Sequence, residues 1–361
     1  MTSNQTYNVL ELFSGIGGMH YALNETVFSK KINEITAMDV NDIGNKVYEY
    51  NFKKKPKATN LDSMNASRYN HYKPDIILMS PPCQPYTRTG NQLNLKDKRS
   101  ISFISFLNSL SEMNSLNYFL LENVYGFERS ESRQVLVEKC LEAGFQYQEF
   151  LINPTDLNIP NSRLRYYFIA KRENVGNFKI AQMNKRLFCS KKTMIIDTEN
   201  NNLLPLTLNE EELINEIYKV LFGIDVTQMS CGTAKLAEFL GDSIFDTKLF
   251  EDYSVPEKII EKYLNVYDIV EPHSVGTCCF TKGYTKYAQG TGSILKLDFK
   301  DGKATRYRYF TEYEIAKLMG FPVMKNKFEF PPEVSLKNRY KLLGNSLNVL
   351  VVSRLINYML S

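Results

Sequence analysis

A short apolar run that ends on two prolines constrains the fold of this chain more than any other stretch. Residues 76–79 are Ile-Ile-Leu-Met, a continuous apolar sequence typical of a strand that is covered on both faces. Pro81 and Pro82 cannot continue a central strand, so the chain leaves the sheet there, and Cys83 follows at once. We interpret Cys83 as a candidate catalytic nucleophile at a strand end; the alternative is a buried and inert cysteine.

Short apolar strands alternate with helices through the first half of the chain. We expect a strand at 7–13, a second that ends at 35–38, a third that ends at 60–62, and further strands at 76–79, 118–121, 147–152 and 165–171. The expected helices are at 19–28, 41–51, 101–113 and 131–143. This alternation predicts an α/β fold with a doubly wound sheet, in which ligands bind at the carboxyl ends of the strands. The first glycine turn, Asp39, Cys83 and Glu122 each follow an expected strand, which favours one shared site.

The glycine turn at Ser14–Gly18 joins the first strand to the first helix. Glycines let a ligand approach the backbone closely, and a helix N-terminus offers free N–H groups. The spacing does not match the dinucleotide fingerprint, because the third glycine would fall at His20, and no Gly-Lys-Ser/Thr follows for a phosphate loop. Asp39 stands about twenty positions further on, where a ribose diol is held. An ordinary tight turn, and a helix cap at Asp39, are the structural alternatives.

The pattern changes after about residue 180, where the alternation stops and polar sequence follows. The elements expected beyond that point are helices at 210–222, 257–263, 311–320 and 344–360 and a strand at 306–310. Thr311 and Glu314 have the spacing of a capping box. We therefore assign residues 1–180, completed by 331–361, to the sheet domain. Residues 181–330 are expected to form a second, smaller domain with a hinge.

The composition limits the kinds of protein to consider. The 361 residues are 43% hydrophobic, enough for a large core, and no apolar run approaches the ~20 residues that cross a bilayer. The N-terminus lacks a signal-peptide pattern, so we expect a cytoplasmic or nuclear protein. The six cysteines lack Cys-x-x-Cys spacing and the three histidines are scattered, which predicts neither disulfides nor a metal site. A net charge of +4 permits a polyanionic partner without requiring one.

Five motifs, taken together and in order, resemble the cytosine-5 methyltransferase family. They are Phe13–Gly18, Pro81–Gln84, Glu122–Val124, Arg163–Arg165 and Gly344–Ser346. Residues 81–88 and 279–284 further resemble the eukaryotic branch formerly classed as DNA methyltransferase homologues, which methylates a cytosine in the anticodon loop of aspartate tRNA. The resemblance implies a Rossmann-like, S-adenosylmethionine-dependent methyltransferase sheet as the catalytic domain. It implies that the smaller domain recognises the target.

The resemblance also implies the catalytic residues. Carbon 5 of cytosine is a poor nucleophile until a thiolate adds to carbon 6, and Cys83 is expected to supply that thiolate. Glu122 is expected to hydrogen-bond or protonate ring N3, and Arg165 to hold the carbonyl oxygen of the base. Arg163 is expected to support the site near Cys83. The alternative for both arginines is a surface ion pair, and the alternative for Glu122 is a helix-capping acid.

Cofactor and substrate contacts are implied in the same way. S-adenosylmethionine, which becomes S-adenosylhomocysteine, is expected to lie over the glycine turn, and no metal is implied. Its expected contacts are Phe13, Ser14, Gly15, Ile16, Gly17, Gly18, Asp39, Val40, Asn60, Leu61, Ser80, Asn345 and Ser346. The residues expected to bind the substrate are Gln84, Arg88, Cys279, Thr281, Lys282 and Tyr284.

Three functions remain open at this point. The signature at 279–284 favours methylation of tRNA, and the same chemistry on DNA is the first alternative. The second alternative is an inactive homologue that binds nucleic acid and keeps only the fold, against which Cys83, Glu122 and Arg165 argue. The expected partner is therefore tRNA, with DNA as the alternative. The sequence leaves the oligomeric state open.

Overall fold

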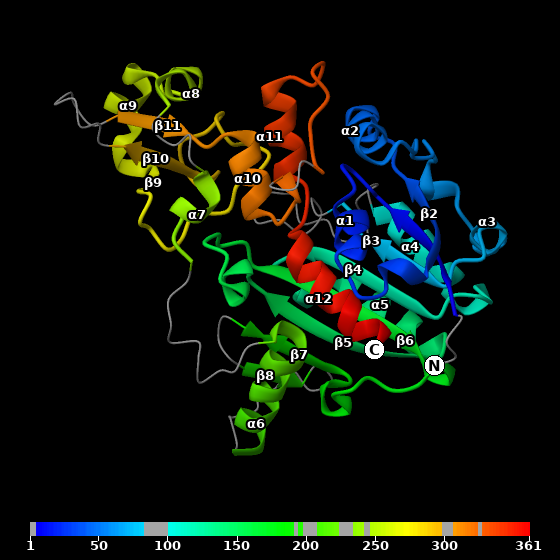
Figure 1. Cartoon of the computed structure of the whole chain (residues 1–361). Coiled ribbons are helices and arrows are strands. Elements are labelled where there is room, and N and C mark those ends of the chain that lie inside the picture. Colours follow the sequence, from blue (N-terminus) through cyan, green and yellow to red (C-terminus); the bar gives the residue numbers. More distant parts are fainter. Residues whose placement is uncertain are drawn as a thin grey trace. The chain divides into compact units, whose positions relative to one another are not determined.

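The structure of the chain is a computed structural model, and two compact units make it up. The described residues are 5–82, 100–190, 194–197, 208–223, 234–241, 246–297, 306–323 and 327–361. The first unit contains Met1–Ile152, Leu164–Gln228 and Val351–Ser361, and the second contains Asn153–Arg163 and Met229–Leu350. Figure 1 shows the elements of each unit along the chain.

A mixed eight-stranded sheet forms the centre of the first unit, in the order β2-β1-β3-β4-β6-β5-β7-β8. The strands are β1 (Tyr7–Leu12), β2 (Ile32–Met38), β3 (Ile76–Met79), β4 (Tyr118–Val124), β5 (Phe145–Ile152), β6 (Arg165–Arg172), β7 (Arg186–Cys189) and β8 (Met194–Asp197). The first four strands pair in parallel, whereas β6 runs antiparallel to both β4 and β5. The carboxyl ends of β1 to β4 therefore share an edge with the start of β6.

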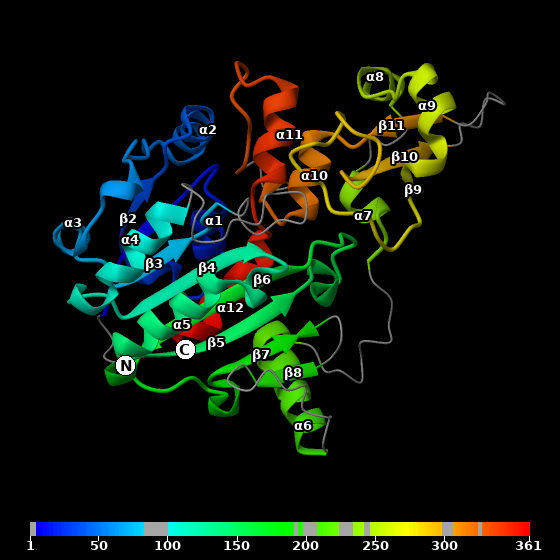
Figure 2. The ribbon, with the colours of Figure 1, turned by 180° about the vertical axis from the view of Figure 1, so that it is seen from behind.

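Helices cover both faces of this sheet, as the doubly wound prediction requires. They are α1 (Gly18–Asn24), α2 (Asp42–Phe52), α3 (Ala66–His71), α4 (Ile101–Ser109), α5 (Glu131–Glu142), α6 (Leu208–Ile217), which continues as a π-helix at Tyr218–Phe222, and α12 (Val349–Leu360). Helix α12 lies over one face in Figure 1, and α4 and α5 lie over the other face in Figure 2. The predicted fold class is confirmed.

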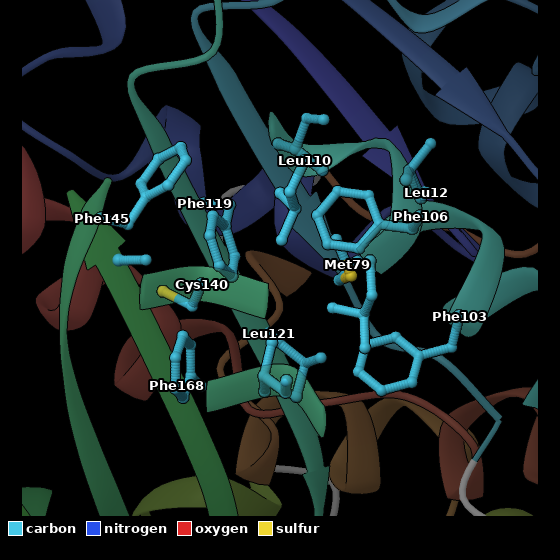
Figure 3. Packing of buried hydrophobic residues seen from close by; sticks show 14 of the residues in the cluster. Leu12, Met79, Phe103, Phe106, Leu110, Phe119, Leu121, Cys140, Phe145 and Phe168 are labelled. Atoms are coloured by element: carbon cyan, nitrogen blue, oxygen red, sulfur yellow. The ribbon is translucent and has the colours of Figure 1, made fainter. Parts of the chain in front are cut away.

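The main core lies between the sheet and the helices α4 and α5 (Figure 3). Alternate residues of a strand point to the same face, and Phe119 and Leu121 of β4 point toward these helices with Phe168 of β6. The Phe119 and Phe168 rings stack with their centroids 5.6 Å apart. The Phe106 ring of α4 packs edge to face against Phe119, with ring centroids 5.7 Å apart. Truncating a ring such as Phe119 to alanine should destabilise the fold by about 3–5 kcal/mol.

Several expected elements differ from the structure. The strand expected at 60–62 is instead a 3₁₀ turn at Leu61–Ser63, because the Asn60 side chain accepts a hydrogen bond from Asp62 N and caps it. The strands β7 and β8 extend the sheet within residues 186–197, where no strand was expected. Both are four residues long and stand in polar sequence, so their apolar signal is weak.

The expected domain boundaries also differ from the two compact units. Residues 181–228 belong with the sheet because β7 pairs in parallel with β5. Residues 331–350 belong to the second unit, which also includes the segment Asn153–Arg163. The roles expected for the two domains, catalysis and target recognition, stay predictions.

The second unit is built around a small three-stranded sheet in the order β11-β10-β9. Its strands are β9 (Asp268–Val270), β10 (Ser293–Leu297) and β11 (Arg306–Tyr309), and its helices are α7 (Ala237–Leu240), α8 (Thr247–Asp252), α9 (Glu257–Tyr263), α10 (Glu312–Leu318) and α11 (Leu336–Gly344). The predicted capping box of Thr311 and Glu314 is confirmed at the start of α10. Glu314 also accepts two hydrogen bonds from the fully buried Arg308, which ties α10 to β11.

Two kinds of feature are absent from the described residues. None of the helices in the described part of the chain is long and apolar enough to cross a membrane. Within the same residues, no group of three or more histidine, cysteine or acidic side chains is arranged to hold a metal ion.

A buried ion pair joins α5 to the sheet. The Glu149 side chain of β5 is completely buried, and its carboxylate accepts hydrogen bonds from Arg133 Nε at 2.9 Å and from the Tyr166 hydroxyl at 2.5 Å. Arg133 Nη2 contacts the other carboxylate oxygen. These donors replace the water that the carboxylate loses on folding.

We expect Arg133→Met to lower the free energy of unfolding by about 3–5 kcal/mol, because it leaves the Glu149 charge buried without its cation. The matched control is Lys139→Met on the same helix, which breaks an exposed pair with Glu142 and should change stability by less than about 1 kcal/mol. Chemical unfolding of the full chain measures both variants. Equal losses in the two variants would contradict this account of Glu149.

Candidate active site

Three polar side chains meet where β3, β4 and β6 share an edge of the sheet. Ser80 follows β3 directly, Glu122 lies within β4, and Arg165 begins β6. The β4–β6 register places Val124 opposite Arg165, so Arg165 and Glu122 are diagonal neighbours on one face. The antiparallel direction of β6 is thus what brings Arg165 to the carboxyl end of β4. Glu122 was expected after its strand, and the structure instead makes it part of the ladder.

Glu122 is held from two sides. The Ser80 hydroxyl donates a hydrogen bond of 2.6 Å to Oε2, and Arg165 Nε lies 3.6 Å from Oε1. The Glu122 side chain is only 8% exposed and that of Arg165 15%, so solvent screens this pair weakly. A carboxyl group and a guanidinium fixed in this way can hydrogen-bond the amide-like edge of a flat heterocycle.

The expected nucleophile lies in a part of the chain that the structure does not describe. Cys83, Gln84 and Arg88 lie outside the described residues, so their roles stay predictions. Pro81 and Pro82 are described, and both lie outside the strand, as predicted from their sequence.

The glycine turn has a backbone that few residues can adopt. Phe13, Gly15 and Gly17 all have positive φ angles, of 57°, 52° and 84°. Gly17 also leaves no room for a side chain, since a Cβ there would lie 2.3 Å from the Phe52 ring. The Asp39 carboxylate fixes the turn, because Oδ2 accepts from Gly15 N at 2.8 Å and Oδ1 accepts from Asn41 N at 2.8 Å. Asp39 therefore shapes the turn, and each oxygen keeps a second lone pair for a ligand hydroxyl.

The turn fits a ligand that lies over it. The buried Ser14 hydroxyl has no hydrogen-bond partner among the described residues, which is uncommon for a buried polar group. A Cβ added at Gly15 would meet no described atom within 4 Å, so the backbone is open there. Val40, next to Asp39, exposes 66% of its surface, whereas Ile16 is buried. An adenosyl group offers both the polar atoms and the apolar ring that these groups can contact.

Other expected cofactor residues are placed less favourably. Leu61 is 4% exposed and belongs to the main core, so it offers little surface to a ligand. The Asn60 side chain already caps the following turn. Asn345 and Ser346 belong to the second unit, where Asn345 ends α11. The expected contacts of Asn345 and Ser346 with the cofactor stay predictions.

Arg163 lies at the centre of a buried hydrogen-bond network in the second unit. It is 4% exposed, so it is not the surface ion-pair partner that was the alternative. Its Nη1 donates to Phe280 O at 3.1 Å and lies 3.3 Å from Cys279 Sγ. Its Nη2 donates to Gly344 O at 3.2 Å and to Ser346 O. One guanidinium thus holds together three motifs that are far apart in the sequence.

Tyr284 was expected to contact the substrate, but the structure buries it. It is 4% exposed, its hydroxyl donates to Ser293 O at 2.7 Å, and the same hydroxyl accepts from Phe310 N at 2.8 Å. The ring therefore supports the unit from inside and is not a surface for stacking. Lys282 is exposed and Thr281 is half-buried, and their expected contacts with substrate stay predictions.

A buried network that was not expected from the sequence lies near the glycine turn. Glu11 of β1 is 1% exposed and accepts from the Tyr48 hydroxyl at 3.1 Å and from His20 N, in the first turns of α1, at 3.3 Å. His20 Nδ1 lies 2.7 Å from the same hydroxyl, and its ring stacks on Phe52 with centroids 3.7 Å apart. Burial raises the pKa of Glu11 to about 8 and lowers the pKa of His20 to about 4. A lone glutamate in an apolar strand gives no sequence signal for these partners.

Comparison with known proteins identifies relatives over nearly the whole chain. A family model described as C-5 cytosine-specific DNA methylase matches residues 7–361. The chain is 37% identical to the human protein named tRNA (cytosine(38)-C(5))-methyltransferase, over 96% of this chain and 97% of that protein. It is 33% identical to a Dictyostelium discoideum protein named DNA (cytosine-5)-methyltransferase, over 98% and 94%. The crystal structure of S. pombe Dnmt2 methyltransferase matches with a TM-score of 0.75 and 33% identity, covering 98% of both chains.

The Glu11 network predicts a pH dependence of stability with a defined sign. In the unfolded chain Glu11 loses its proton near the ordinary value of 4.5, whereas in the folded chain it keeps the proton up to about pH 8. The folded state binds the extra proton between these values, so its stability falls as the pH rises. His20 acts in the opposite sense, but only between about pH 4 and 6.5. The range from pH 6.5 to 8 therefore separates the effect of Glu11 from that of His20.

We expect Glu11→Gln to remove this loss, so that the free energy of unfolding of the parent falls by about 2 kcal/mol more than that of the variant between pH 6.5 and 8. Chemical unfolding at several pH values measures the difference. The matched control is Glu49→Gln on α2, an exposed glutamate whose replacement should leave the profile of the parent unchanged. Parallel profiles for the parent and Glu11→Gln would refute the assignment.

Proposed function

Because the chain belongs to the C-5 cytosine-specific DNA methylase family, we propose that it methylates carbon 5 of a cytosine in the anticodon loop of tRNA, with aspartate tRNA as the substrate. The family resemblance read from the five motifs is confirmed, and the chain is a cytosine-5 methyltransferase. The proposal for tRNA is supported by relatives of 34–37% identity that carry the name tRNA (cytosine(38)-C(5))-methyltransferase.

The observation that carries the proposed chemistry is the cluster of Ser80, Glu122 and Arg165. Glu122 and Arg165 present a carboxyl group and a guanidinium side by side at the carboxyl edge of the sheet. A cytosine ring offers a matching edge, with N3 and the amino group for Glu122 and the carbonyl oxygen for Arg165. Both contacts would strengthen as the ring takes up negative charge during addition of a nucleophile.

In the proposed reaction Cys83 acts as the nucleophile. Its thiolate adds to carbon 6 of the cytosine, which forms an S–C bond and makes carbon 5 nucleophilic. S-adenosylmethionine, which the family implies, supplies an electrophilic methyl group when it is bound. Once methylated, carbon 5 loses its proton to a base, and the S–C bond breaks to regenerate the thiolate. The chain would hold the methyl donor with the Ser14 hydroxyl, the open backbone at Gly15 and the Asp39 carboxylate.

Two considerations favour tRNA over DNA. The motif from Cys279 to Tyr284 resembles the branch of the family that methylates tRNA. The Arg163 side chain holds its first two residues in place through contacts with Cys279 Sγ and Phe280 O. A target base must also leave its stack to react with the Cys83 thiol, and a tRNA anticodon loop already presents unstacked bases. DNA is the second candidate, because a relative of 33% identity is named as a DNA methyltransferase.

Transfer of labelled methyl groups to total tRNA and to duplex DNA separates these candidates. We expect incorporation into tRNA at one cytosine of the anticodon loop, located by sequencing. We expect Cys83→Ala to abolish it, and RNA that carries 5-fluorocytosine to form a covalent adduct with the parent protein, because fluorine blocks the last elimination. Strong transfer to DNA with none to tRNA would refute the substrate, and persistent turnover by Cys83→Ala would refute the nucleophile. No transfer to any nucleic acid would leave only an inactive homologue.

Ser80 is expected to act as a positioning residue for Glu122. A hydrogen bond to a charged group contributes about 1.5–3 kcal/mol, so we expect Ser80→Ala to lower kcat at least about tenfold while KM for tRNA stays nearly constant. The matched control is Ser109→Ala, which removes a buried hydroxyl that bonds Ser105 O within α4. Equilibrium binding of S-adenosylmethionine gives a second readout. Weaker binding with an unchanged kcat would mean that Ser80 acts through the cofactor instead.

A further inference from the structure

A groove in the second unit is lined by many tyrosine side chains. It lies among α9, residues 285–289, the strand β11 and the first turns of α11, and its volume is about 1040 Å³. Six tyrosines line it: Tyr253, Tyr263, Tyr267, Tyr287, Tyr309 and Tyr340. None of them belongs to the cluster around Glu122, so the proposed reaction does not explain them.

The inner walls of this groove, which we call the tyrosine groove, are fixed in place. The Tyr253 hydroxyl donates to Glu312 at 2.6 Å, and the Tyr340 hydroxyl donates to Phe310 O at 2.6 Å. Tyr309 and Tyr340 both pack edge to face against the buried Tyr284, with ring centroids 5.6 and 5.2 Å apart. Tyr284 is thus the internal support of the groove. Walls fixed in advance lose little entropy when a flat ligand binds between them.

The floor of the groove offers a hydrogen-bond donor. The hydroxyls of Tyr267 and Tyr309 lie 3.2 Å apart and form one hydrogen bond with each other. Two hydroxyls carry two protons, and their mutual bond uses one of them, so the other can be donated to a ligand. Burial raises the pKa of Tyr309 above its usual value, so this group stays protonated at neutral pH.

The rim of the groove combines exposed aromatic rings with cations. Tyr287 is 58% exposed and Lys286 Nζ lies 5.0 Å from the centroid of its ring, and Lys262 Nζ lies 5.1 Å from the centroid of Tyr263. Lys286 and Lys337 line the groove, together with one acidic residue, Asp252. The charged rim therefore favours an anion by a small margin.

The loop that carries Lys286 and Tyr287 is held over the groove. Thr285 has a φ of 66°, a conformation that is rare for a β-branched residue. Lys286 N and Tyr287 N both donate to Gly283 O, at 2.9 and 3.2 Å. Tyr287 O accepts from the Thr291 hydroxyl at 2.6 Å. The exposed ring of Tyr287 is therefore carried by an ordered turn.

We propose that the tyrosine groove binds an unpaired nucleotide of the RNA substrate other than the target cytosine, with its base stacked on Tyr287 or Tyr263 and its phosphate near Lys286. This inference rests on the proposed function. Stacking on aromatic rings next to lysines is how proteins hold single-stranded nucleic acid without a base-specific contact. Ile259, Val266 and Leu336 add apolar surface, which a peptide could also use, but a peptide gives no reason for the cations beside the rings.

Replacing the rings one at a time tests the groove. We expect Tyr287→Ala and Tyr263→Ala each to raise Kd and KM for tRNA about tenfold at a fixed salt concentration, and to leave kcat and cofactor binding nearly unchanged. Tyr287→Trp keeps a stacking surface and should restore binding. The matched control is Tyr50→Ala in the first unit, which removes a ring that is also exposed and also has a lysine nearby, Lys53 at 4.8 Å.

The outcomes separate this proposal from the proposed function. If the parent neither binds nor methylates tRNA, the proposed function fails and the groove proposal fails with it. If the parent methylates tRNA but both alanine variants bind it as tightly as the parent does, the groove is not an RNA site and only this proposal is overturned. A loss with Tyr287→Ala that Tyr287→Trp does not restore, or that equals the loss in Tyr50→Ala, also overturns it.

Discussion

Burial of the mixed sheet on both faces is the constraint on which the rest of the structure depends. A carboxyl group on such a strand has little access to water, so it must be paired, hydrogen-bonded or protonated. Glu149 is paired with Arg133 deep in the sheet, and burial raises the pKa of Glu11 below the glycine turn. Glu122 lies two residues before the end of β4, beside Arg165. The same physical requirement therefore produces a structural ion pair, a protonated support and the candidate catalytic group.

The sheet and most of its ligand edge could be predicted because their signals are local. Apolar runs mark β1, β3 and β4, and parallel strands necessarily bring the residues that follow them to one edge. The cluster at Glu122 could not be predicted from such local signals, because Arg165 lies beside Glu122 only when β6 runs antiparallel to β4. The sequence gives Arg165 and Glu122 no local pairing signal, and the family resemblance supplied the link. The partners of Glu11 likewise come from separate helices, so no spacing rule could identify them.

In the second unit, the motif at 279–284 did not predict the burial of Tyr284. Tyr284 stands in a loop-like sequence with basic and small residues, which favours an exposed aromatic contact. In the structure it supports Tyr309 and Tyr340 from inside. The motif of Arg163 and Arg165 is divided in a similar way, since the boundary between the two units passes just after Arg163. Burial depends on contacts between distant segments, and those contacts have no fixed spacing in the sequence.

The Ser80 hydroxyl limits what can lie beside Glu122. A hydroxyl has one proton, and Ser80 donates it to Oε2 of Glu122 at 2.6 Å. Toward any second partner Ser80 can then act only as an acceptor. A methyl donor that lies over the glycine turn carries an ammonium group, which can donate to such an acceptor. The two roles expected for Ser80, near the cofactor and near the catalytic carboxyl group, are compatible when the hydrogen bonds run from the cofactor through Ser80 to Glu122.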